Sequence, residues 1–392
     1  MKNRNILYIS FDGLLDPLGQ SQIIPYITHI SKLGNLIVVS LEKNFRINSS
    51  KDLETTFDWT YFYFTKKYKL ISKFYDFIKI LIFSIYICKK KSINIVHCRG
   101  HLPAIIGLVL KKIYKIKFIF DFRGFWIDER VDNGSINKNL FLDKVLFNIL
   151  KKIEKILLNK SDAFIFLTAF AANEVKKEIK KKIFFQIIPC ATDYNIFKKK
   201  KLKNNYLPRK NKYLCYLGSL GGVYLLEEML NFYYFLNKFD NRYKFLFITN
   251  NVKIIKENNI YRNDKFLRTN LIIKNLNRKQ IPKYLQSCHY AISFIRPTWA
   301  RKSSFPTKIS EYLSMNLPII YNYGLKGVDD FFNKKKLGKG IKIKKTYTDG
   351  DIKKILKNLK IYKNNNKLRS ISEKLLSMEI ANKNYSKIYE KI

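Results

Sequence analysis

The amino-acid sequence predicts an α/β fold with two Rossmann-like domains in series, each built on a doubly wound parallel sheet. Three observations lead to this prediction: the chain has 392 residues, short apolar runs alternate with helical patterns in both halves, and a charged segment separates the halves. A chain of this length is too long for one ordinary core and suits two domains of about 150 to 200 residues. Alternating strands and helices are typical of parallel sheets that carry helices on both faces.

The first domain is expected to cover residues 1–197. Its predicted strands are short apolar runs, and helical patterns fit between several of them. The strands are predicted at residues 6–10, 36–41, 59–64, 93–97, 117–121, 163–167 and 185–189, and the helices at 20–32, 102–112 and 140–159.

A linker is predicted at residues 198–212, KKKKLKNNYLPRKNK, because this stretch is charged, contains one proline and has little apolar content. The second domain is expected over residues 213–377. Residues 378–392 have a helical pattern and are a candidate for packing back on the first domain. In the second domain, strands are predicted at residues 213–218, 244–249, 270–273, 290–295, 317–321 and 340–343, and helices at 225–236, 281–287 and 306–316.

The formal net charge of +45 indicates that the surface attracts anions such as lipid headgroups and phosphates. The abundant Lys, Asn, Ile, Phe and Tyr all have A/T-rich codons, so genome composition accounts for much of the lysine. A specific nucleic-acid partner is therefore not expected, whereas an anionic membrane surface is. With 47% hydrophobic residues, the chain can bury two cores and is not globally disordered.

The five cysteines are scattered and odd in number, which favours a reducing compartment and argues against disulfides and a zinc site. The first strand pattern follows the N-terminus without a long apolar segment, so no secretory signal is expected. Residues 74–88 are apolar but too short to span a membrane, and they contain Asp76 and Lys79. A buried or interfacial helix is expected there, in a cytoplasmic protein that is peripheral on the inner face of the membrane.

The first loop lies in the sequence SFDGLLDPLGQSQIIPYI, where Gly13 and Gly19 follow a predicted strand and Gln20 opens a helix. Glycines at such positions allow the backbone to approach an anionic or hydroxylated ligand. The spacing departs from GxGxxG, so a dinucleotide is not indicated. An ordinary strand-to-helix turn explains the same residues equally well.

Five polar side chains are predicted to gather at the ends of two adjacent strands, in IVHCRGH and FDFRGFWIDER. His97, Asp121 and Arg123 are the candidate catalytic residues, while Arg99 and His101 are candidates for lining an acceptor site. The charged guanidinium of Arg123 can donate paired hydrogen bonds to a phosphate or carboxylate. Asp121 can accept a hydrogen bond from Arg123 or from a sugar hydroxyl. Any one of these histidines alone is more often structural than catalytic.

The second domain begins with another glycine loop, YLGSLGGVYLLEEM. Gly218, Gly221 and Gly222 lie between a strand and a helix, where backbone N–H groups can bind a diphosphate. A tight turn without a ligand is the alternative.

The segment RPTWARKSSFPTKISEYL combines bases with a helix start. Arg296, Lys302 and Lys308 suit phosphate groups, and Glu311 suits the two hydroxyls of a ribose. Lys308 and Glu311 are three residues apart and therefore lie on one helix face. They could instead form a simple surface ion pair.

Taken in order, these segments resemble retaining glycosyltransferases of the GT-B fold, family 4. The resemblance covers residues 5–325, and it implies two domains facing a cleft, a nucleotide diphosphate sugar bound by the second domain and an acceptor bound by the first. It also implies that no metal is needed, that Lys308 binds the diphosphate or sugar and that Glu311 binds the donor ribose. The segments are DGLLDPLGQSQIIPYI, DFRGFWIDER, SDAFIFLT, IPCATDYNIF, YLGSLGGVYLLEEM and SSFPTKISEYLSMNLPII.

The sequence departs from this family in three places. Ser303 stands where relatives often have a glutamate, Arg123 where many have a histidine, and Ser219 with glycines where an Arg and a Lys often follow the strand. Arg296, Arg301 or Lys302 could replace those bases.

Three functions follow as hypotheses. The first is retaining transfer of a sugar to a hydroxyl of a cell-surface glycan or lipid-linked acceptor, as in lipopolysaccharide or polysaccharide biosynthesis. The second hypothesis is that the protein is a nucleotide-sugar epimerase of the same fold. The third is that it is a non-catalytic basic protein that binds polyanions.

Overall fold

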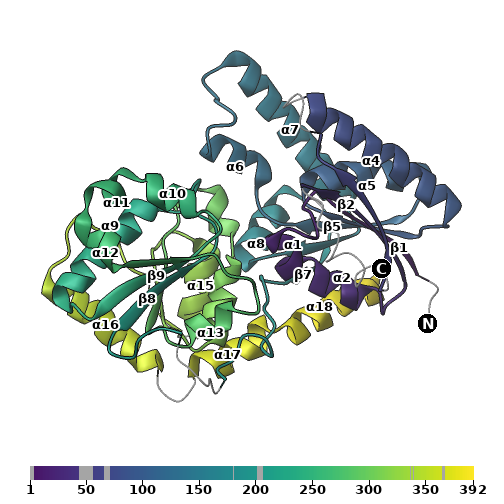
Figure 1. Cartoon of the computed structure of the whole chain (residues 1–392). Helices are drawn as coiled ribbons and strands as arrows, with labels where there is room; N and C mark the ends of the chain where they lie inside the picture. Colours follow the sequence, from purple (N-terminus) through teal and green to yellow (C-terminus); the bar gives the residue numbers. More distant parts are fainter. Residues whose placement is uncertain are drawn as a thin grey trace. The chain divides into compact units, whose positions relative to one another are not determined.

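Two parallel sheets organise the chain, one of seven strands and one of five (Figure 1). The computed structural model describes residues 4–43, 56–65, 71–179, 181–200, 206–335, 337–338, 340–363 and 367–392. Each sheet belongs to its own unit, Met1–Cys190 with Met378–Ile392 and Ala191–Ser377. The predicted α/β fold with two doubly wound parallel sheets is confirmed.

The first unit ends at Cys190, whereas the first domain was predicted to end at residue 197. The second unit begins at Ala191, so the predicted linker at residues 198–212 falls inside it. Residues 201–205 of that segment lie outside the described residues. The last helix, α18 (Met378–Lys391), belongs to the first unit.

The sheet of the first unit has the strand order β3-β2-β1-β4-β5-β6-β7, with every neighbouring pair parallel. All of its strands were predicted from the apolar runs, because strands covered on both faces are apolar nearly throughout. The strands are β1 (Asn5–Ser10), β2 (Asn35–Glu42), β3 (Asp58–Tyr63), β4 (Ile95–Arg99), β5 (Lys117–Phe122), β6 (Ala163–Phe166) and β7 (Phe184–Ile187).

Helices cover both faces of this sheet (Figure 1). One layer contains α4, α5 and α7, with α5 in contact with both of the others, and α2 and α18 contact each other in the opposite layer. The helices are α1 (Pro17–Gln22), α2 (Ile24–Ile30), α4 (Ile71–Lys90), α5 (His101–Tyr114), α6 (Trp126–Asp132), α7 (Phe141–Lys160) and α8 (Ala169–Glu178).

The prediction of one helix over residues 20–32 is wrong, because the chain breaks at Ile23 between α1 and α2. Ile23 has non-helical angles, φ −127° and ψ −61°. Pro25 follows, and its missing N–H prevents the preceding turn from continuing.

The sheet of the second unit has the order β10-β9-β8-β11-β12. The predicted strand at residues 340–343 is wrong, because there Ile341 makes only an isolated bridge to Asn322 among the described residues. A strand needs a longer run of pairing than this. The strands are β8 (Lys212–Leu217), β9 (Tyr243–Ile248), β10 (Leu271–Lys274), β11 (Tyr290–Ser293) and β12 (Ile319–Tyr321).

The core of the second unit is rich in aromatic residues, including Tyr216, Phe232 and Phe247, which are fully buried. None of the helices in the described ranges has the length and apolar character needed to cross a membrane. The helical elements are α9 (Leu226–Phe239), α10 (Val252–Glu257), α11 (Asn259–Asn263), α12 (Lys265–Asn270), α13 (Ile281–Leu285), η2 (Ala300–Ser303), α14 (Thr307–Ser314), α15 (Lys326–Lys335), α16 (Asp349–Lys363) and α17 (Lys367–Leu376).

Candidate functional site

In the first unit, strand register brings polar residues into one row across the sheet. Ser10 is the partner of Arg99, and Arg99 is the partner of Asp121. Two residues earlier along the strands, Tyr8 is the partner of His97. Since residues two apart in a strand share a face, these side chains lie on the same face of the sheet near its carboxyl edge.

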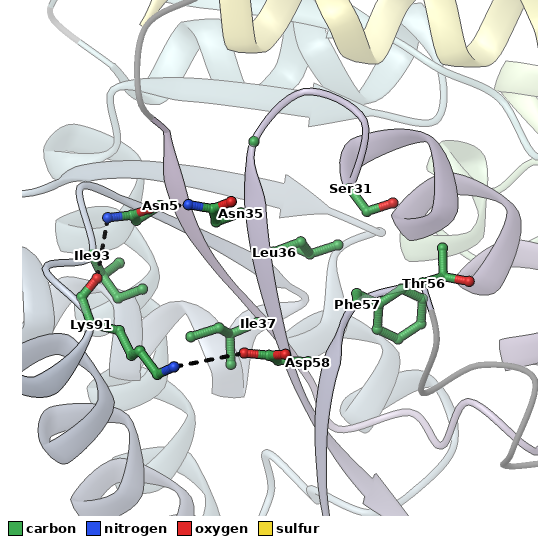
Figure 2. Close-up of a pocket in the computed structure, with 11 residues that line it drawn as sticks. Asn5, Ser31, Asn35, Leu36, Ile37, Thr56, Phe57, Asp58, Lys91 and Ile93 are labelled. Atoms are coloured by element: carbon green, nitrogen blue, oxygen red, sulfur yellow. Dashed lines mark hydrogen bonds and ion pairs between the residues drawn. The ribbon is translucent and has the colours of Figure 1, made fainter.

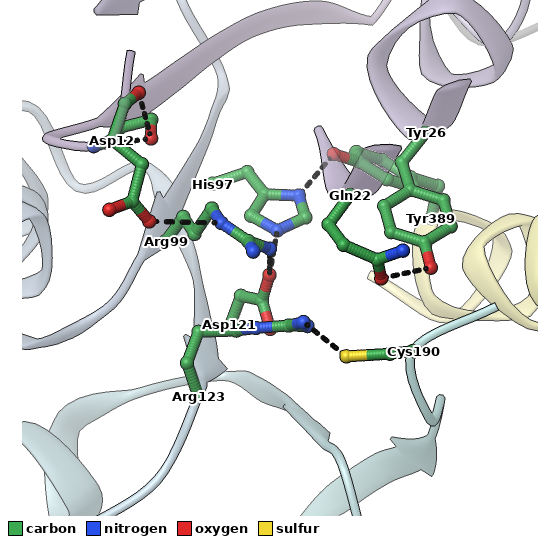
Figure 3. A network of polar contacts seen from close by, with 10 residues as sticks. Asp12, Gln22, Tyr26, His97, Arg99, Asp121, Arg123, Cys190 and Tyr389 are labelled. Atoms are coloured by element: carbon green, nitrogen blue, oxygen red, sulfur yellow. Dashed lines mark hydrogen bonds and ion pairs between the residues drawn. The ribbon is translucent and has the colours of Figure 1, made fainter. Parts of the chain in front are cut away.

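Asp121 lies at the centre of this network (Figure 3). Its Oδ2 is 3.3 Å from Arg99 Nη1 and its Oδ1 is 3.3 Å from Arg123 Nη1. His97 Nε2 lies 4.0 Å from Oδ2. The carboxylate is fully buried, so the two guanidinium groups compensate a charge that would otherwise be very costly.

His97 is fully buried, and its Nδ1 is 2.7 Å from the hydroxyl of Tyr389 on α18. Burial lowers the pKa of His97 to about 4, although the carboxylate of Asp121 acts in the opposite direction. The imidazole is therefore neutral at neutral pH. A neutral, enclosed ring of this kind orients its neighbours and does not itself reach a substrate.

Two members of the network reach solvent. The side chain of Arg123 is 17% exposed, and that of Asp12, which lies 3.5 Å from Arg99 Nε, is 49% exposed. Arg123 also donates from Nη2 to Cys190 Sγ at 3.7 Å. Burial lowers the pKa of Arg123, but Asp121 more than offsets this, so the guanidinium remains charged. A ligand hydroxyl or phosphate would meet these two side chains first.

His101 does not join this network. It lies at the start of α5, where its Nε2 is 2.8 Å from Glu154 Oε2 on α7, and its ring stacks on Trp126. It also contacts Phe120 and Phe122, which alternate with Asp121 along β5 and therefore face the opposite side of the sheet. This geometry indicates a structural role in holding α5 on α7.

The loop after β1 already holds an internal anion. The carboxylate of Glu42 accepts hydrogen bonds from Leu14 N at 2.7 Å, Leu15 N at 3.2 Å and the hydroxyl of Ser40 at 2.6 Å. A Cβ at Gly13 would approach Glu42 Oε2 to 2.6 Å, so the glycine is needed for this contact. These two N–H groups are thus used within the chain.

The other two predicted residues of this loop have structural contacts as well. Gly19 is buried, and a Cβ there would lie 2.0 Å from Gly13 O, so α1 can pack on the loop only with glycine. Gln20 is exposed and donates to Leu15 O at 3.1 Å.

In the second unit, Lys308 lies in a cage of two aromatic rings. Its Nζ donates to the Tyr216 hydroxyl at 2.8 Å and lies 4.0 Å from the Tyr216 ring centroid and 3.9 Å from that of Tyr224. No carboxylate lies within ion-pair distance of it among the described residues. Burial lowers the pKa of Lys308 well below its usual range, while Glu311 raises it.

The glycine loop after β8 begins next to this ammonium group. A Cβ at Gly218 would lie 3.2 Å from Lys308 Nζ, and Gly218, Gly221 and Gly222 have φ of +119°, +86° and +62°. The N–H groups of Gly218 and Leu220 bind Ile248 O and Asn251 Oδ1. In the part of the chain that the structure describes, no acceptor within the protein binds the N–H groups of Gly221 and Gly222.

Glu311 pairs with Arg278 and not with Lys308. Arg278 Nη1 donates to Glu311 Oε1 at 2.7 Å, and the Glu311 side chain is only 7% exposed. Lys308 is buried too, so the two residues do not form a surface ion pair. The carboxylate is oriented by a residue that the sequence did not single out.

The remaining predicted bases lie on the segment before α14. Arg296 is exposed, and its backbone N–H donates to Val223 O at 2.8 Å, which ties it to the glycine loop. Lys302 is half-buried on η2. Ser303 is fully buried and donates to Ala300 O at 2.7 Å, so it stabilises η2.

The sequence did not predict several contributors to these sites: Glu42, Tyr216, Tyr224, Arg278 and Tyr389. Tyr216 and Tyr224 flank the predicted glycine loop, and that position is the only local signal for them. No cluster of His, Cys, Asp or Glu able to hold a metal ion occurs among the described residues.

A cavity of about 460 Å³ lies at the amino ends of β1, β2 and β3 (Figure 2). Its polar groups bind each other: Asn35 Nδ2 donates to Asn5 Oδ1 at 3.0 Å, and Lys91 Nζ is 4.0 Å from Asp58. Ligands of parallel sheets bind at the opposite, carboxyl ends of the strands. The cavity is therefore separate from the polar network in this unit.

No protein-family model matches this sequence, and none of the curated proteins is similar to it in sequence. The fold is similar to that of HepE from Anabaena, solved with UDP and glucose, with a TM-score of 0.72 at 10% identity over 99% of both chains. It is also similar to sucrose-phosphate synthase from Thermosynechococcus elongatus, with a TM-score of 0.71 at 11% identity over 99% of both chains.

A third similar structure is a UDP-N-acetylglucosamine 2-epimerase, with a TM-score of 0.61 at 10% identity over 100% of this chain and 98% of that one. At such low identities, the likenesses establish the fold alone. They show an α/β protein of the GT-B fold with two parallel sheets.

Proposed function

We propose that the protein is a glycosyltransferase that moves a sugar from a nucleotide diphosphate sugar to a hydroxyl group. The observation that carries this proposal is the buried ammonium of Lys308 beside Gly218, where the glycine loop begins at the carboxyl end of β8. Such a charge, next to the start of a loop that carries N–H groups without acceptors among the described residues, suits a diphosphate. The fold shared with HepE, which was solved with UDP and glucose, supports a nucleotide-sugar donor.

The donor roles follow from the contacts in the second unit. Lys308, with Arg296 and Lys302, would neutralise the diphosphate, and the N–H groups of Gly221 and Gly222 would bind its oxygens. The free oxygen of the Glu311 carboxylate would accept hydrogen bonds from the ribose. Bases and backbone dipoles can stabilise the leaving diphosphate, so we expect the reaction to need no metal.

The acceptor would bind the first unit through Arg123 and Asp12, the solvent-accessible ends of the buried network. Asp121, Arg99 and His97 would then hold Arg123 in place. We infer retention at the anomeric carbon from the family resemblance: the bond to the phosphate breaks, the acceptor oxygen bonds on the same face, and the leaving phosphate takes the acceptor proton.

The acceptor we propose is a cell-surface glycan or a lipid-linked precursor, as in lipopolysaccharide or polysaccharide biosynthesis. The proposal rests on the net charge of +45, which favours the anionic inner face of the cytoplasmic membrane as the place of action. On this hypothesis the protein is cytoplasmic and peripheral, and it has no specific nucleic-acid partner.

The test is a thermal-shift screen against uridine, guanosine and cytidine diphosphates and their sugars. A ligand that binds only the folded state raises the melting temperature in proportion to the logarithm of its concentration above Kd. We expect a shift with one nucleotide that is lost in Glu311→Ala and retained in Glu373→Ala, whose side chain is 48% exposed. No shift with any nucleotide in folded protein contradicts the proposal.

A nucleotide-sugar epimerase is the second candidate, because the fold is also similar to that of a 2-epimerase. Incubation with the donor distinguishes the two reactions: a transferase releases nucleoside diphosphate and needs an acceptor, whereas an epimerase yields an isomeric sugar nucleotide. A basic polyanion-binding protein would instead bind DNA or acidic glycan in a salt-sensitive way that Lys308→Ala does not change.

A further inference from the structure

The first half of α7 exposes a row of large apolar side chains. Phe141 is 77% exposed and Leu142 is 78% exposed, while Val145, Leu146 and Ile149 are 40%, 45% and 49% exposed. Their spacing of one, four, five and eight residues places them along one side of the helix.

This half of the helix extends past the core of its unit. The buried residues of α7 are Glu154, Leu157 and Leu158, all in its second half. Leu140, just before the helix, is 57% exposed. Single exposed apolar residues are ordinary, but a contiguous group of this size on a monomer marks an interaction site.

The surroundings of the row are basic. Lys144 and Lys152 are exposed on the same helix, and Lys138 lies 3.8 Å from the centroid of the Phe147 ring. The nearby Asp143 accepts a hydrogen bond from Asn137 N at 2.7 Å. An exposed apolar row flanked by lysines is the pattern of a helix that lies in the interface of an anionic bilayer.

The same charges argue against a second copy of the chain as the occupant. In a two-fold symmetric contact, the same surface of each copy meets the other, so the lysines of one copy would lie close to those of the second. Lysines facing lysines repel each other, whereas lipid phosphates attract them.

We propose that Leu140, Phe141, Leu142, Val145, Leu146 and Ile149 form a membrane-docking surface. These side chains insert among the headgroups and upper acyl chains of an anionic bilayer, and Lys138, Lys144 and Lys152 contact the lipid phosphates. The proposal does not depend on glycosyl transfer, because it concerns a surface and not the donor site.

Vesicle flotation tests the proposal. We expect the wild-type chain to float with phosphatidylcholine–phosphatidylglycerol vesicles and not with phosphatidylcholine alone, and Phe141→Asp/Leu142→Asp to bind at least tenfold more weakly. The matched control is Tyr234→Asp/Ile260→Asp in the second unit, where the side chains are 44% and 40% exposed. Wild-type binding by the Phe141/Leu142 variant, or no binding by the wild-type chain, overturns the proposal.

A site-specific label gives a second measurement. The cysteines among the described residues, Cys88, Cys98, Cys190, Cys215 and Cys288, are all buried, so Leu142→Cys is expected to react selectively with an environment-sensitive fluorophore. Anionic vesicles should shift its emission to the blue and allow quenching by lipids that carry a nitroxide. A label that stays in water on bound protein overturns the proposal. So does light scattering that shows a dimer which Phe141→Asp/Leu142→Asp dissociates.

Discussion

Arg278 Nη1 lies 2.7 Å from Glu311 Oε1 and fixes one oxygen of that carboxylate. Arg278 is itself held, because Nη2 donates to Thr192 Oγ1 at 3.3 Å and the guanidinium lies over the Phe197 ring. The second carboxylate oxygen has no hydrogen-bond partner among the described residues. Glu311 is thus a preoriented acceptor, as a ribose site requires.

Arg278→Ala is expected to weaken the discrimination between ribose and deoxyribose in the donor nucleotide. Without the guanidinium, the Glu311 carboxylate loses its fixed orientation, so the hydrogen bond to a ribose hydroxyl weakens by about 1–2 kcal/mol. Titration calorimetry with the nucleoside diphosphate and its 2′-deoxy form measures this as an affinity ratio that falls about tenfold.

Arg242→Ala is the control, because Arg242 is 60% exposed and pairs with Asp240 away from Glu311. If Arg278→Ala lowers both affinities equally, Arg278 is structural. If wild-type protein binds neither nucleotide, the proposed donor site itself is wrong.

Lys308 and Glu311 became candidates from the sequence because both lie in one short helix with a recognisable start. It could not identify Arg278, which is 33 positions before Glu311 in the chain and meets it only after folding. Glu42 was missed for the same reason, since a carboxylate at the end of β2 gives no local sign that it will bind the loop after β1.

The strands of the first unit were predictable, because central parallel strands are nearly continuous apolar runs. Residues 340–343 failed as a strand because, among the described residues, they pair with a neighbour only through the isolated bridge of Ile341 to Asn322. His101 was grouped with His97 because the two are close in sequence. In the structure, His97 lies on β4 and His101 at the start of α5, and their side chains lie on opposite faces of the sheet.

Glu42→Ala is expected to lower the free energy of unfolding by about 3 kcal/mol, because it leaves two N–H groups and the Ser40 hydroxyl buried without an acceptor. Urea denaturation followed by circular dichroism measures the change. Glu174→Ala serves as the control, since Glu174 pairs with Lys177, which is 68% exposed, and should cost less than about 1 kcal/mol. Equal losses in the two variants would show that the loop does not depend on Glu42.

His97 is expected to make the protein sensitive to acid. Its folded pKa is about 4, below the ordinary value of 6.5, so between these pH values the unfolded chain binds more protons than the folded one. The free energy of unfolding therefore falls by about 3 kcal/mol as the pH drops through this window. His97→Gln should flatten this part of the stability curve measured by urea titration.

The control for this prediction is His29→Gln, since His29 is half-buried and its Nε2 lies 2.8 Å from Ser386 Oγ. Burial lowers the pKa of His29 as well, so this variant should remove a smaller part of the slope. An unchanged slope in His97→Gln would mean that the imidazole is protonated in the folded protein.

Lys308→Met is expected to stabilise the protein and abolish donor binding. Burial holds the pKa of Lys308 below its ordinary value of 10.5. Between the folded pKa and 10.5, the unfolded chain therefore binds more protons than the folded protein. The free energy of unfolding rises with pH over that range. Methionine fills similar volume without a charge, which should raise the free energy of unfolding at pH 7 by about 1–3 kcal/mol.

Urea titrations at pH 7 and pH 9.5, together with calorimetry of the nucleoside diphosphate, measure both effects of Lys308→Met. Lys326→Met should change neither, because Lys326 is 55% exposed and pairs with Asp330. A less stable Lys308→Met that still binds nucleotide would make Lys308 a structural residue. Stability gained with binding lost would identify Lys308 as a group retained for its ligand, because a buried lysine without a carboxylate destabilises the empty protein.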